Sequence, residues 1–286
     1  MVMGELTQEA EVLVIGSGPG GYAAAFRAAD LGLDVTMVDP KARPGGVCLY
    51  KGCIPSKTFL YLTELIYDAA RAEAMGISFG KPRIDLEALR TWKGKVIDQM
   101  ADGLVRLNNR RGIQLLKGRV EFESSNTVRV HDCEVSHIKF KHAILATGSQ
   151  PIPFPKTTFK TGGRIMSSTG ALALADVPEK LLVLGGGYVG LELGTVYAAL
   201  GSRVSLVELE GRLLAGVDQD LVQPLHRRLA KIFESINLKS RVVSRAENKN
   251  GVDVIFEGSI DTPQQTFDKV LVAIGREPCS QDIGLA

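Results

Sequence analysis

The chain has 286 residues, a length that predicts two domains at roughly 150 residues each. Hydrophobic residues make up 45% and charged residues 23%, the balance of a globular protein rather than a disordered one. The net charge is only +2, which gives no bulk electrostatic reason to expect nucleic acid or an anionic membrane as a partner. The first eleven residues lack the basic and apolar regions of a secretory signal, so we expect a cytoplasmic location.

The N-terminal region has the pattern of a nucleotide-binding unit. The apolar run 11–15 predicts a buried strand, a glycine loop follows at 16–21, and an Ala-rich helix is expected over 22–30. A second strand over 34–38 ends at Asp39. Strand, glycine turn, helix and strand together predict a right-handed crossover unit with a parallel sheet.

The first loop has the G-x-G-x-x-G spacing at Gly16, Gly18 and Gly21. These glycines allow a tight turn, close approach of the backbone to a pyrophosphate, and helix packing against the strand. Asp39 lies where a ribose-binding carboxylate is expected, about 20 residues further on. The pattern favours dinucleotide binding, and the alternative is a glycine turn in a purely structural unit.

The middle of the chain predicts a helical insert and a small β-meander. Apolar residues recur at helical spacing in 56–73 and 93–111. Short strands are expected after them, at 113–116, 120–123 and 127–130. The proline-rich segment 151–155 is the clearest linker.

The second half repeats the unit, with a strand at 181–184, a helix at 189–200 and a strand at 204–207. Its glycine loop carries Gly185, Gly187 and Gly190. The run 181–201 is apolar enough to resemble a transmembrane helix, but its glycines and a central glutamate favour a buried strand that leads into a helix. Further strands are expected at 251–256 and 267–274.

Glu208 follows this second unit where the acid is expected. A carboxylate there accepts from both ribose hydroxyls and repels a 2′-phosphate, so the residue favours NAD over NADP. Arg203 lies before the strand, and Arg212, beyond the acid, is a weak signal in the opposite direction.

Cys48 and Cys53 form a close pair about 30 residues after the first glycine loop. The pair admits a structural disulfide, a zinc site, two inert thiols or a redox dithiol. A cytoplasmic setting disfavours the first, and the lack of a second Cys pair or His cluster disfavours the second. Lys51, Lys57 and a helix that starts near Ser56 favour thiolates, which supports the redox interpretation; no metal is expected.

Four motifs carry a resemblance to the flavoprotein disulfide reductases, most closely to the dihydrolipoyl dehydrogenase family of FAD-dependent pyridine nucleotide-disulfide oxidoreductases. They are the cysteine motif from Gly45-Gly46-Val47-Cys48 to Cys53-Ile54-Pro55-Ser56-Lys57, the box Ala146-Thr147-Gly148-Ser149, the second glycine loop through Glu192, and Ala273-Ile274-Gly275-Arg276. The family's mercuric and glutathione reductases usually have Thr where Val47 stands.

The resemblance implies a role for each matching position. Cys53 would touch the flavin, Cys48 would exchange with the substrate disulfide, and Lys57 would pair with Glu192 near the flavin. FAD would contact Gly16, Gly18, Gly21, Asp39, Gly46, Lys57, Gly118, Thr147 and Gly148. NAD would contact Gly185, Gly187, Gly190, Glu208, Val242, Ala273, Gly275 and Arg276.

The expected fold is α/β with two Rossmann-like, three-layer nucleotide-binding domains. We expect an FAD-binding domain over 1–152, with the helical insert 56–111 and the meander 113–142, and an NAD-binding domain over 153–277. Residues 278–286 would begin an incomplete return to the FAD domain. In the family, a C-terminal dimerisation domain supplies a catalytic histidine base, and we expect this domain to be absent from the 286 residues considered.

The expected function is oxidation of protein-bound dihydrolipoamide through a Cys48–Cys53 disulfide, with hydride transfer to NAD and little turnover by this chain alone. Partners would be the lipoyl domain or acyltransferase component of a 2-oxo acid dehydrogenase complex, or a glycine-cleavage lipoyl protein. The full-length family forms homodimers, a state in doubt for this chain. Alternatives are a catalytically silent dinucleotide-binding fragment, an NADH-dependent diaphorase, and a mercuric or glutathione type of reductase. Smaller departures from the family are Asp39, Tyr50-Lys51 and Cys279.

Overall fold

The computed structural model describes residues 6–155, 157–281 and 283–285. The chain divides into two compact units, each assembled from separate stretches of sequence. The first unit comprises Met1–Ile54, Lys95–Gln150 and Glu277–Ala286. The second comprises Pro55–Gly94 and Pro151–Arg276.

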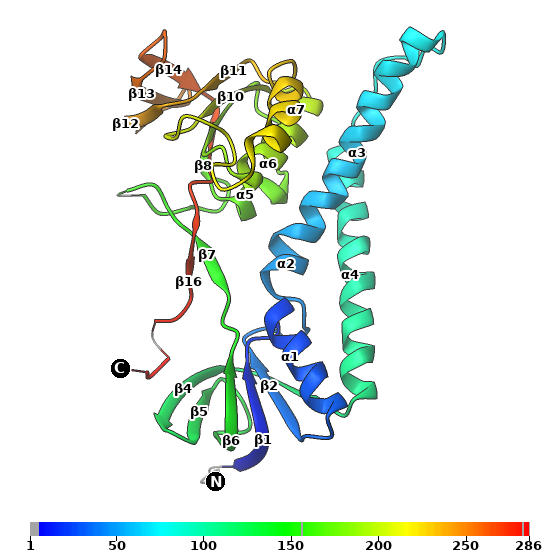
Figure 1. The fold of residues 1–286 in the computed structure, drawn as a ribbon, viewed down its shortest axis with the longest axis vertical. Helices are drawn as coiled ribbons and strands as arrows, with labels where there is room; N and C mark the ends of the chain where they lie inside the picture. Colours follow the sequence, from blue (N-terminus) through cyan, green and yellow to red (C-terminus); the bar gives the residue numbers. More distant parts are fainter. Residues whose placement is uncertain (1–5, 156, 282, 286) are drawn as a thin grey trace. The chain divides into compact units, whose positions relative to one another are not determined.

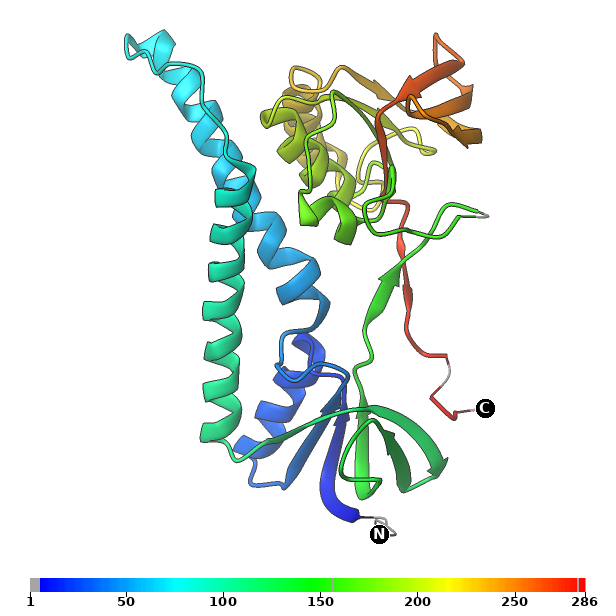
Figure 2. The ribbon, with the colours of Figure 1, turned by 180° about the vertical axis from the view of Figure 1, so that it is seen from behind.

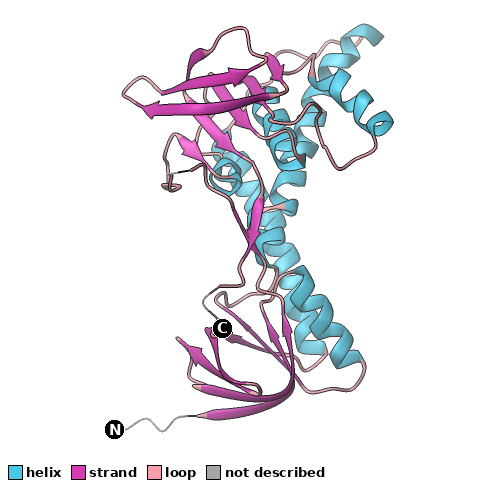
Figure 3. Cartoon of the chain, turned by 60° about the vertical axis from the view of Figure 1, so that its left-hand side comes forward, coloured by secondary structure: helices cyan, strands magenta, loops and turns pink. Residues whose placement is uncertain are grey.

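The first unit is built on a six-stranded sheet with the order β3-β2-β1-β6-β5-β4 (Figure 1). Strands β3, β2, β1 and β6 run parallel, and β5 and β4 add an antiparallel edge. Figure 3 shows how strongly this sheet curves. The strands are β1 (Thr7–Ile15), β2 (Val35–Asp39), β3 (Gln114–Lys117), β4 (Arg119–Ser124), β5 (Thr127–His131) and β6 (His137–Leu145).

Helix α1 (Pro19–Asp30) packs on this sheet through small residues. Ala25 and Ala28 are buried against Val14 and Met37 of the central strands. Gly18 lies at the N-cap and Pro19 at the first helical position, where a missing backbone N–H costs nothing. The loop therefore ends at Gly18, and residues 19–21, which were predicted to belong to the loop, form the first turn of α1.

The dithiol segment forms two helices rather than one. Helix α2 (Gly46–Lys51) carries Cys48, and helix α3 (Cys53–Ala72) begins at Cys53. Gly52 separates them with an irregular backbone conformation. The sequence predicted only the later part of α3, so α2 is an additional element.

The second unit contains a five-stranded parallel sheet with the order β11-β10-β9-β15-β8. Its strands are β8 (Ile165–Met166), β9 (Lys180–Leu184), β10 (Arg203–Val207), β11 (Ser235–Asn237) and β15 (Lys269–Val272). Its helices are α5 (Ser168–Ala173), α6 (Tyr188–Ala199) and α7 (Gln219–Leu229). The apolar run 181–201 is thus strand β9, a loop and helix α6, and none of the described helices is long and apolar enough to cross a membrane.

Alternate residues of β9 face two different cores, which makes the second unit three-layered. Leu181 and Val183 belong to the core that contains α6 and α7, whereas Leu182 and Leu184 pack toward an antiparallel sheet on the other face. That sheet has the order β12-β13-β14, formed by β12 (Ser240–Glu247), β13 (Val252–Gly258) and β14 (Gln264–Phe267). A separate two-stranded sheet pairs β7 (Ser149–Pro151) with β16 (Arg276–Pro278).

Part of the predicted helical insert belongs to the second unit. Helix α3 and helix α4 (Leu86–Arg110) form an antiparallel pair, seen from behind in Figure 2, and the short η1 (Glu73–Met75) lies between them in the chain. Phe59 is buried in the α6–α7 core, and Leu86 and Leu89 pack against the same core. These contacts explain why residues 55–94 cluster with the second unit, where the sequence analysis put 56–111 in the first domain.

The predicted α/β class with Rossmann-like parallel sheets is confirmed. Of the predicted strands, 11–15, 34–38, 181–184 and 204–207 all lie inside observed strands or begin one residue before them. The helices α5 and α7 and the strands β7, β8, β11, β12, β14 and β16 were not predicted.

Candidate functional site: two dinucleotide loops and a dithiol

The first glycine loop is shaped by contacts that only glycine permits. Gly16 has a positive φ of 102°, and a Cβ there would lie 2.2 Å from the carbonyl oxygen of Ala146. A Cβ at Gly21 would lie 1.8 Å from the carbonyl oxygen of Gly16. The loop is therefore held by backbone packing, and it leads into the N-terminus of α1, where the first N–H groups have no partner within the helix.

Asp39 closes this loop from the end of β2. Its Oδ2 accepts from the Ser17 backbone N–H and its Oδ1 from the Lys41 backbone N–H, both at 2.8 Å. The Ser17 hydroxyl is fully buried and has no hydrogen-bond partner within the described part of the chain. A buried hydroxyl without a partner, beside a helix N-terminus, fits the phosphate oxygens of a dinucleotide.

The start of helix α2 lies directly against this loop. Gly46 has a φ of 57°, and a Cβ there would come within 2.5 Å of the Gly18 Cα. Cys48 on α2 is half-buried, while Cys53 is exposed. Burial raises the pKa of Tyr22 on α1, and the nearby Cys48 and Cys53 add to the shift. The two cysteines and the first glycine loop thus lie close together within the first unit.

Three further predicted FAD residues lie in the same unit. The Gly118 N–H donates to the Asp39 carbonyl at 2.9 Å, and its missing side chain makes room for Val130. Thr147 and Gly148 lie just after the C-terminal end of β6. Ala146, which precedes them, is the residue whose carbonyl packs against Gly16. Gly148 has a φ of 77°.

Lys57 pairs with Glu192, as the resemblance implied. Lys57 Nζ lies 2.5 Å from Glu192 Oε1, and the Ser56 hydroxyl donates to Oε2 at 2.9 Å. The lysine side chain is 61% exposed and the glutamate 24%. The sequence analysis did not assign a role to Ser56, which is buried and completes the coordination of this carboxylate.

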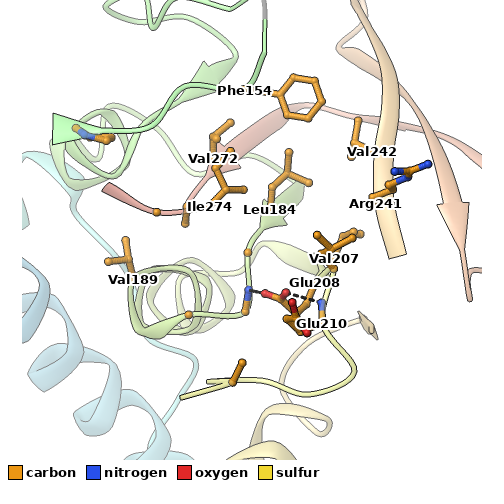
Figure 4. Close-up of a pocket in the computed structure, with 18 of the residues that line it drawn as sticks. Phe154, Leu184, Val189, Val207, Glu208, Glu210, Arg241, Val242, Val272 and Ile274 are labelled. Carbon is orange, nitrogen blue, oxygen red and sulfur yellow. Dashed lines mark hydrogen bonds between the residues drawn. The ribbon is translucent and has the colours of Figure 1, made fainter. Parts of the chain in front are cut away.

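The second glycine loop repeats the geometry of the first. A Cβ at Gly185 would lie 2.4 Å from the Ala273 carbonyl oxygen, and one at Gly190 would lie 2.1 Å from the Gly185 carbonyl oxygen. Glu208 accepts from the Gly186 N–H at 2.5 Å and from the Glu210 N–H at 2.7 Å (Figure 4). The separation of 22 residues between donor and acid is the same as for Ser17 and Asp39.

A cavity of about 620 Å³ opens above this loop, a volume typical of small-ligand sites. Every predicted NAD residue except Gly190 lines it: Gly185, Gly187, Glu208, Val242, Ala273, Gly275 and Arg276. Gly190 is buried under the loop instead. A Cβ at Gly187 would meet nothing within 4 Å, so this glycine faces open space as an approaching phosphate requires.

The cavity also has walls that the sequence analysis missed. Phe154, Arg241 and Val242 line it, and Figure 4 shows Arg241 and Val242 side by side on β12. The Arg245 guanidinium stacks over the Phe154 ring, 5.2 Å from its centroid. Phe154 stands in the proline-rich segment that was predicted to be only a linker, and its aromatic character was the one available signal.

Comparison with known proteins identifies the family. A family profile described as pyridine nucleotide-disulphide oxidoreductase matches residues 10–286. The chain belongs to this family of oxidoreductases. Flavoprotein disulfide reductases and dihydrolipoyl dehydrogenases, the members that it resembles, use FAD and NAD(P).

Relatives with assigned names point to one branch of the family. The chain is 40% identical over 286 residues to dihydrolipoyl dehydrogenase from Geobacillus stearothermophilus, and 41% identical over 272 residues to that from Vibrio cholerae. These matches cover 100% and 94% of the chain, but only 60% and 57% of the relatives. The chain thus spans about three fifths of the length of the relatives it matches.

Solved structures agree at the level of the fold. The Cu(II) complex of the HOCl-induced flavoprotein disulfide reductase RclA from Escherichia coli superposes with a TM-score of 0.79 at 26% identity. The match covers 97% of this chain and 59% of that one.

Proposed function

We propose that the chain carries the electron-transfer half of a dihydrolipoyl dehydrogenase. The observation that carries the proposal is the contact between Gly46 and Gly18, which puts helix α2, the carrier of Cys48, against the first glycine loop. The reaction would oxidise a protein-bound dihydrolipoyl dithiol to its disulfide and reduce NAD⁺ to NADH, with release of one proton. Two electrons leave the substrate sulfurs and two arrive at the nicotinamide, so the reaction balances.

FAD would be held by the first loop, with its pyrophosphate at the N-terminus of α1 and a ribose hydroxyl at Asp39. The buried Ser17 hydroxyl and the crowded glycines support this assignment. Bound FAD would supply two-electron transfer between a dithiol and a pyridine nucleotide. The chain's own task is to hold the pyrophosphate and to keep side chains out of its path.

Cys48 and Cys53 would form the disulfide that accepts electrons from the substrate. A substrate thiolate would attack Cys48 and release Cys53 as a thiolate, and the second substrate thiol would then displace Cys48. The half-buried Cys48 and the exposed Cys53 both lie in the first unit. The ion pair with Glu192 would hold the Lys57 ammonium in place on the helix that begins at Cys53.

NAD would occupy the cavity of the second unit. The pyrophosphate would lie over Gly187, and Glu208 would accept from the adenosine ribose hydroxyls. Each Glu208 oxygen already accepts one backbone N–H and retains a second lone pair for a ribose hydroxyl. A 2′-phosphate would meet this carboxylate and that of Glu210, so the cavity favours NAD over NADP.

The base that deprotonates the substrate thiol would come from the part of the relatives' sequence that this chain does not match. The 286-residue chain alone is therefore expected to give little lipoamide turnover. In the complete protein the partners would be a lipoyl domain or acyltransferase component, or a glycine-cleavage lipoyl protein, with a homodimer as the active form and the cytoplasm as its location.

An absorption spectrum of the purified chain tests the proposal. The protein should retain a yellow flavin, and anaerobic NADH should bleach it and produce a long-wavelength band from a thiolate beside the flavin. The Cys48→Ser variant should still bleach but lose dithiol-linked electron uptake. A colourless protein that binds only NADH would support a silent dinucleotide-binding fragment and overturn the proposal. Repeated turnover of NADH by Cys48→Ser at the wild-type rate, beyond the single reduction that bleaches the flavin, would instead support a diaphorase.

A further inference from the structure

The loop that joins β2 to helix α2 is held by hydrogen bonds and ion pairs at several points. This loop, residues 40–45, leads into Gly46 and then Cys48. Gly45 and Gly46 have φ values of 135° and 57°, conformations that glycine adopts without strain but does not enforce. A turn of two such glycines is flexible on its own, so its order must come from neighbouring contacts.

Arg43 ties the loop to helix α4. Its Nη1 donates to Asp98 Oδ1 at 2.9 Å, and its Nη2 donates to the Asp98 carbonyl at 3.0 Å and to Asp102 Oδ1 at 2.5 Å. The two aspartates lie one helical turn apart on one face, and the planar guanidinium reaches both at once. The arginine side chain is 38% exposed, so it is partly covered even though the aspartates are open to solvent.

Tyr50 ties the same loop to helix α2 itself. Its hydroxyl donates to the Pro44 carbonyl at 3.1 Å, and Pro44 is buried. Burial raises the pKa of Tyr50, so the hydroxyl keeps the proton that it donates. The next residue, Gly45, donates its N–H to the Ser17 carbonyl at 2.8 Å, which joins the fastened loop to the dinucleotide loop.

We propose that Arg43 and Tyr50 are positioning residues for Cys48: together they hold the loop 40–45, and through it the first turn of α2, against the glycine loop. Arg43 bonds the loop to α4, and Tyr50 bonds the carbonyl of Pro44, the residue directly before Gly45. Without either contact the turn can open, and Cys48 loses its half-buried position. The proposal rests on the proposed function only in giving Cys48 a redox role.

The test measures the accessibility of Cys48 and needs no turnover. The 286-residue chain is reduced, treated with iodoacetamide, and alkylation of each cysteine is followed by peptide mass spectrometry. The exposed Cys53 in the same sample is the internal reference, because opening of the loop changes a half-buried thiol more than an exposed one. Arg43→Met and Tyr50→Phe are compared with Arg129→Met, which breaks the ion pair to Glu123 elsewhere in the first unit.

The ratio of Cys48 to Cys53 alkylation should rise about threefold to fivefold in Arg43→Met and in Tyr50→Phe, as loss of an exposed ion-pair network or one hydrogen bond predicts. It should stay at the wild-type value in Arg129→Met. Molar salt should raise the ratio in the wild type and leave Arg43→Met unchanged, because salt screens exposed ion pairs. If Arg43→Met does not fold, Arg43→Lys and Asp102→Asn replace it, with the same expected direction.

Equal ratios in the wild type, Arg43→Met and Tyr50→Phe would overturn the proposal. So would a rise of the same size in Arg129→Met, since that would mean general loosening of the first unit. If the proposed function were wrong but this proposal right, the alkylation ratio would still rise in Arg43→Met and Tyr50→Phe, but the purified chain would lack the flavin spectrum described above.

Discussion

The Ser56 hydroxyl donates a hydrogen bond to Oε2 of Glu192 at 2.9 Å, across 136 positions of sequence. Lys57 occupies the other oxygen of that carboxylate at 2.5 Å. Adjacent residues of one helix thus hold the two oxygens of a single acid on another. Ser56 is buried, whereas the Lys57 side chain is mostly exposed to solvent, although the lysine is the charged partner.

We expect Ser56→Ala to lower the free energy of unfolding by about 1 kcal/mol, because it removes a buried hydrogen bond to a carboxylate. Lys57→Met should cost less, since a 61% exposed ion pair is screened by water. Ser56→Thr keeps the hydroxyl and serves as the matched control. Urea unfolding followed by circular dichroism provides the measurement. A larger loss in Lys57→Met than in Ser56→Ala would reverse this ranking.

Replacing Glu208 should weaken NADH binding at least about tenfold, because an amide can accept for only one of the groups that the carboxylate serves. The variant is Glu208→Gln, with binding followed by calorimetry. Glu210→Gln is the control: this residue also lines the cavity, but its contact with Glu208 is made by its backbone N–H, which the substitution keeps. Identical affinities for both variants would contradict the assigned role of Glu208.

Two glycines in the second loop should respond to alanine in opposite ways. In Gly187→Ala the new methyl group meets nothing within 4 Å, so the fold should remain stable while NADH binding weakens. In Gly190→Ala the methyl group would lie 2.1 Å from the Gly185 carbonyl oxygen, and the unfolding free energy should drop by about 2 kcal/mol or more. Thermal melts and NADH titration of both variants separate the two effects. A stable Gly190→Ala protein would show that the loop can shift.

Tyr197 should make the fold sensitive to alkali. Burial raises its pKa far above the usual value of 10, so the folded chain keeps this proton where the unfolded chain loses it. Its contribution to stability therefore falls as pH rises above 10, by about 1.4 kcal/mol per pH unit.

Tyr197→Phe isolates that effect. At neutral pH the variant should be less stable by about 1 kcal/mol, because the hydroxyl donates to the Ala171 carbonyl at 2.9 Å. Above pH 10 the deficit should shrink and then reverse. Tyr61→Phe, at a residue that is 60% exposed, is the control for alkaline unfolding in urea. A constant difference between wild type and Tyr197→Phe across this pH range would rule out the effect.

Both dinucleotide loops could be predicted because their geometry excludes every residue but glycine at particular points. Gly16, Gly21, Gly185 and Gly190 each lie against a carbonyl oxygen that a Cβ would strike. Such a constraint leaves a direct record in composition and spacing. The acids were found for the same reason, since each ends a strand at a fixed distance from its loop.

Contacts between distant segments left no comparable record. The helical periodicity of 56–73 shows that one face is buried, but not that Phe59 is buried in the α6–α7 core. Likewise Phe154 reads as part of a linker until β12 is seen beside it, and β12 itself has too polar a pattern to predict a strand. Arg43 carries no signal of its own, because its partners on α4 are 55 and 59 positions away.

Asp39 and Glu208 are structural equivalents, each tied to a backbone N–H in its glycine loop and to another just beyond itself. FAD and NAD share an adenosine diphosphate moiety, so this moiety of either ligand would make the same contacts at both loops. Discrimination between the two must then depend on the walls around each loop and on the ring at the far end of the ligand. Grafting one loop onto the other half of the chain should therefore leave cofactor choice unaltered.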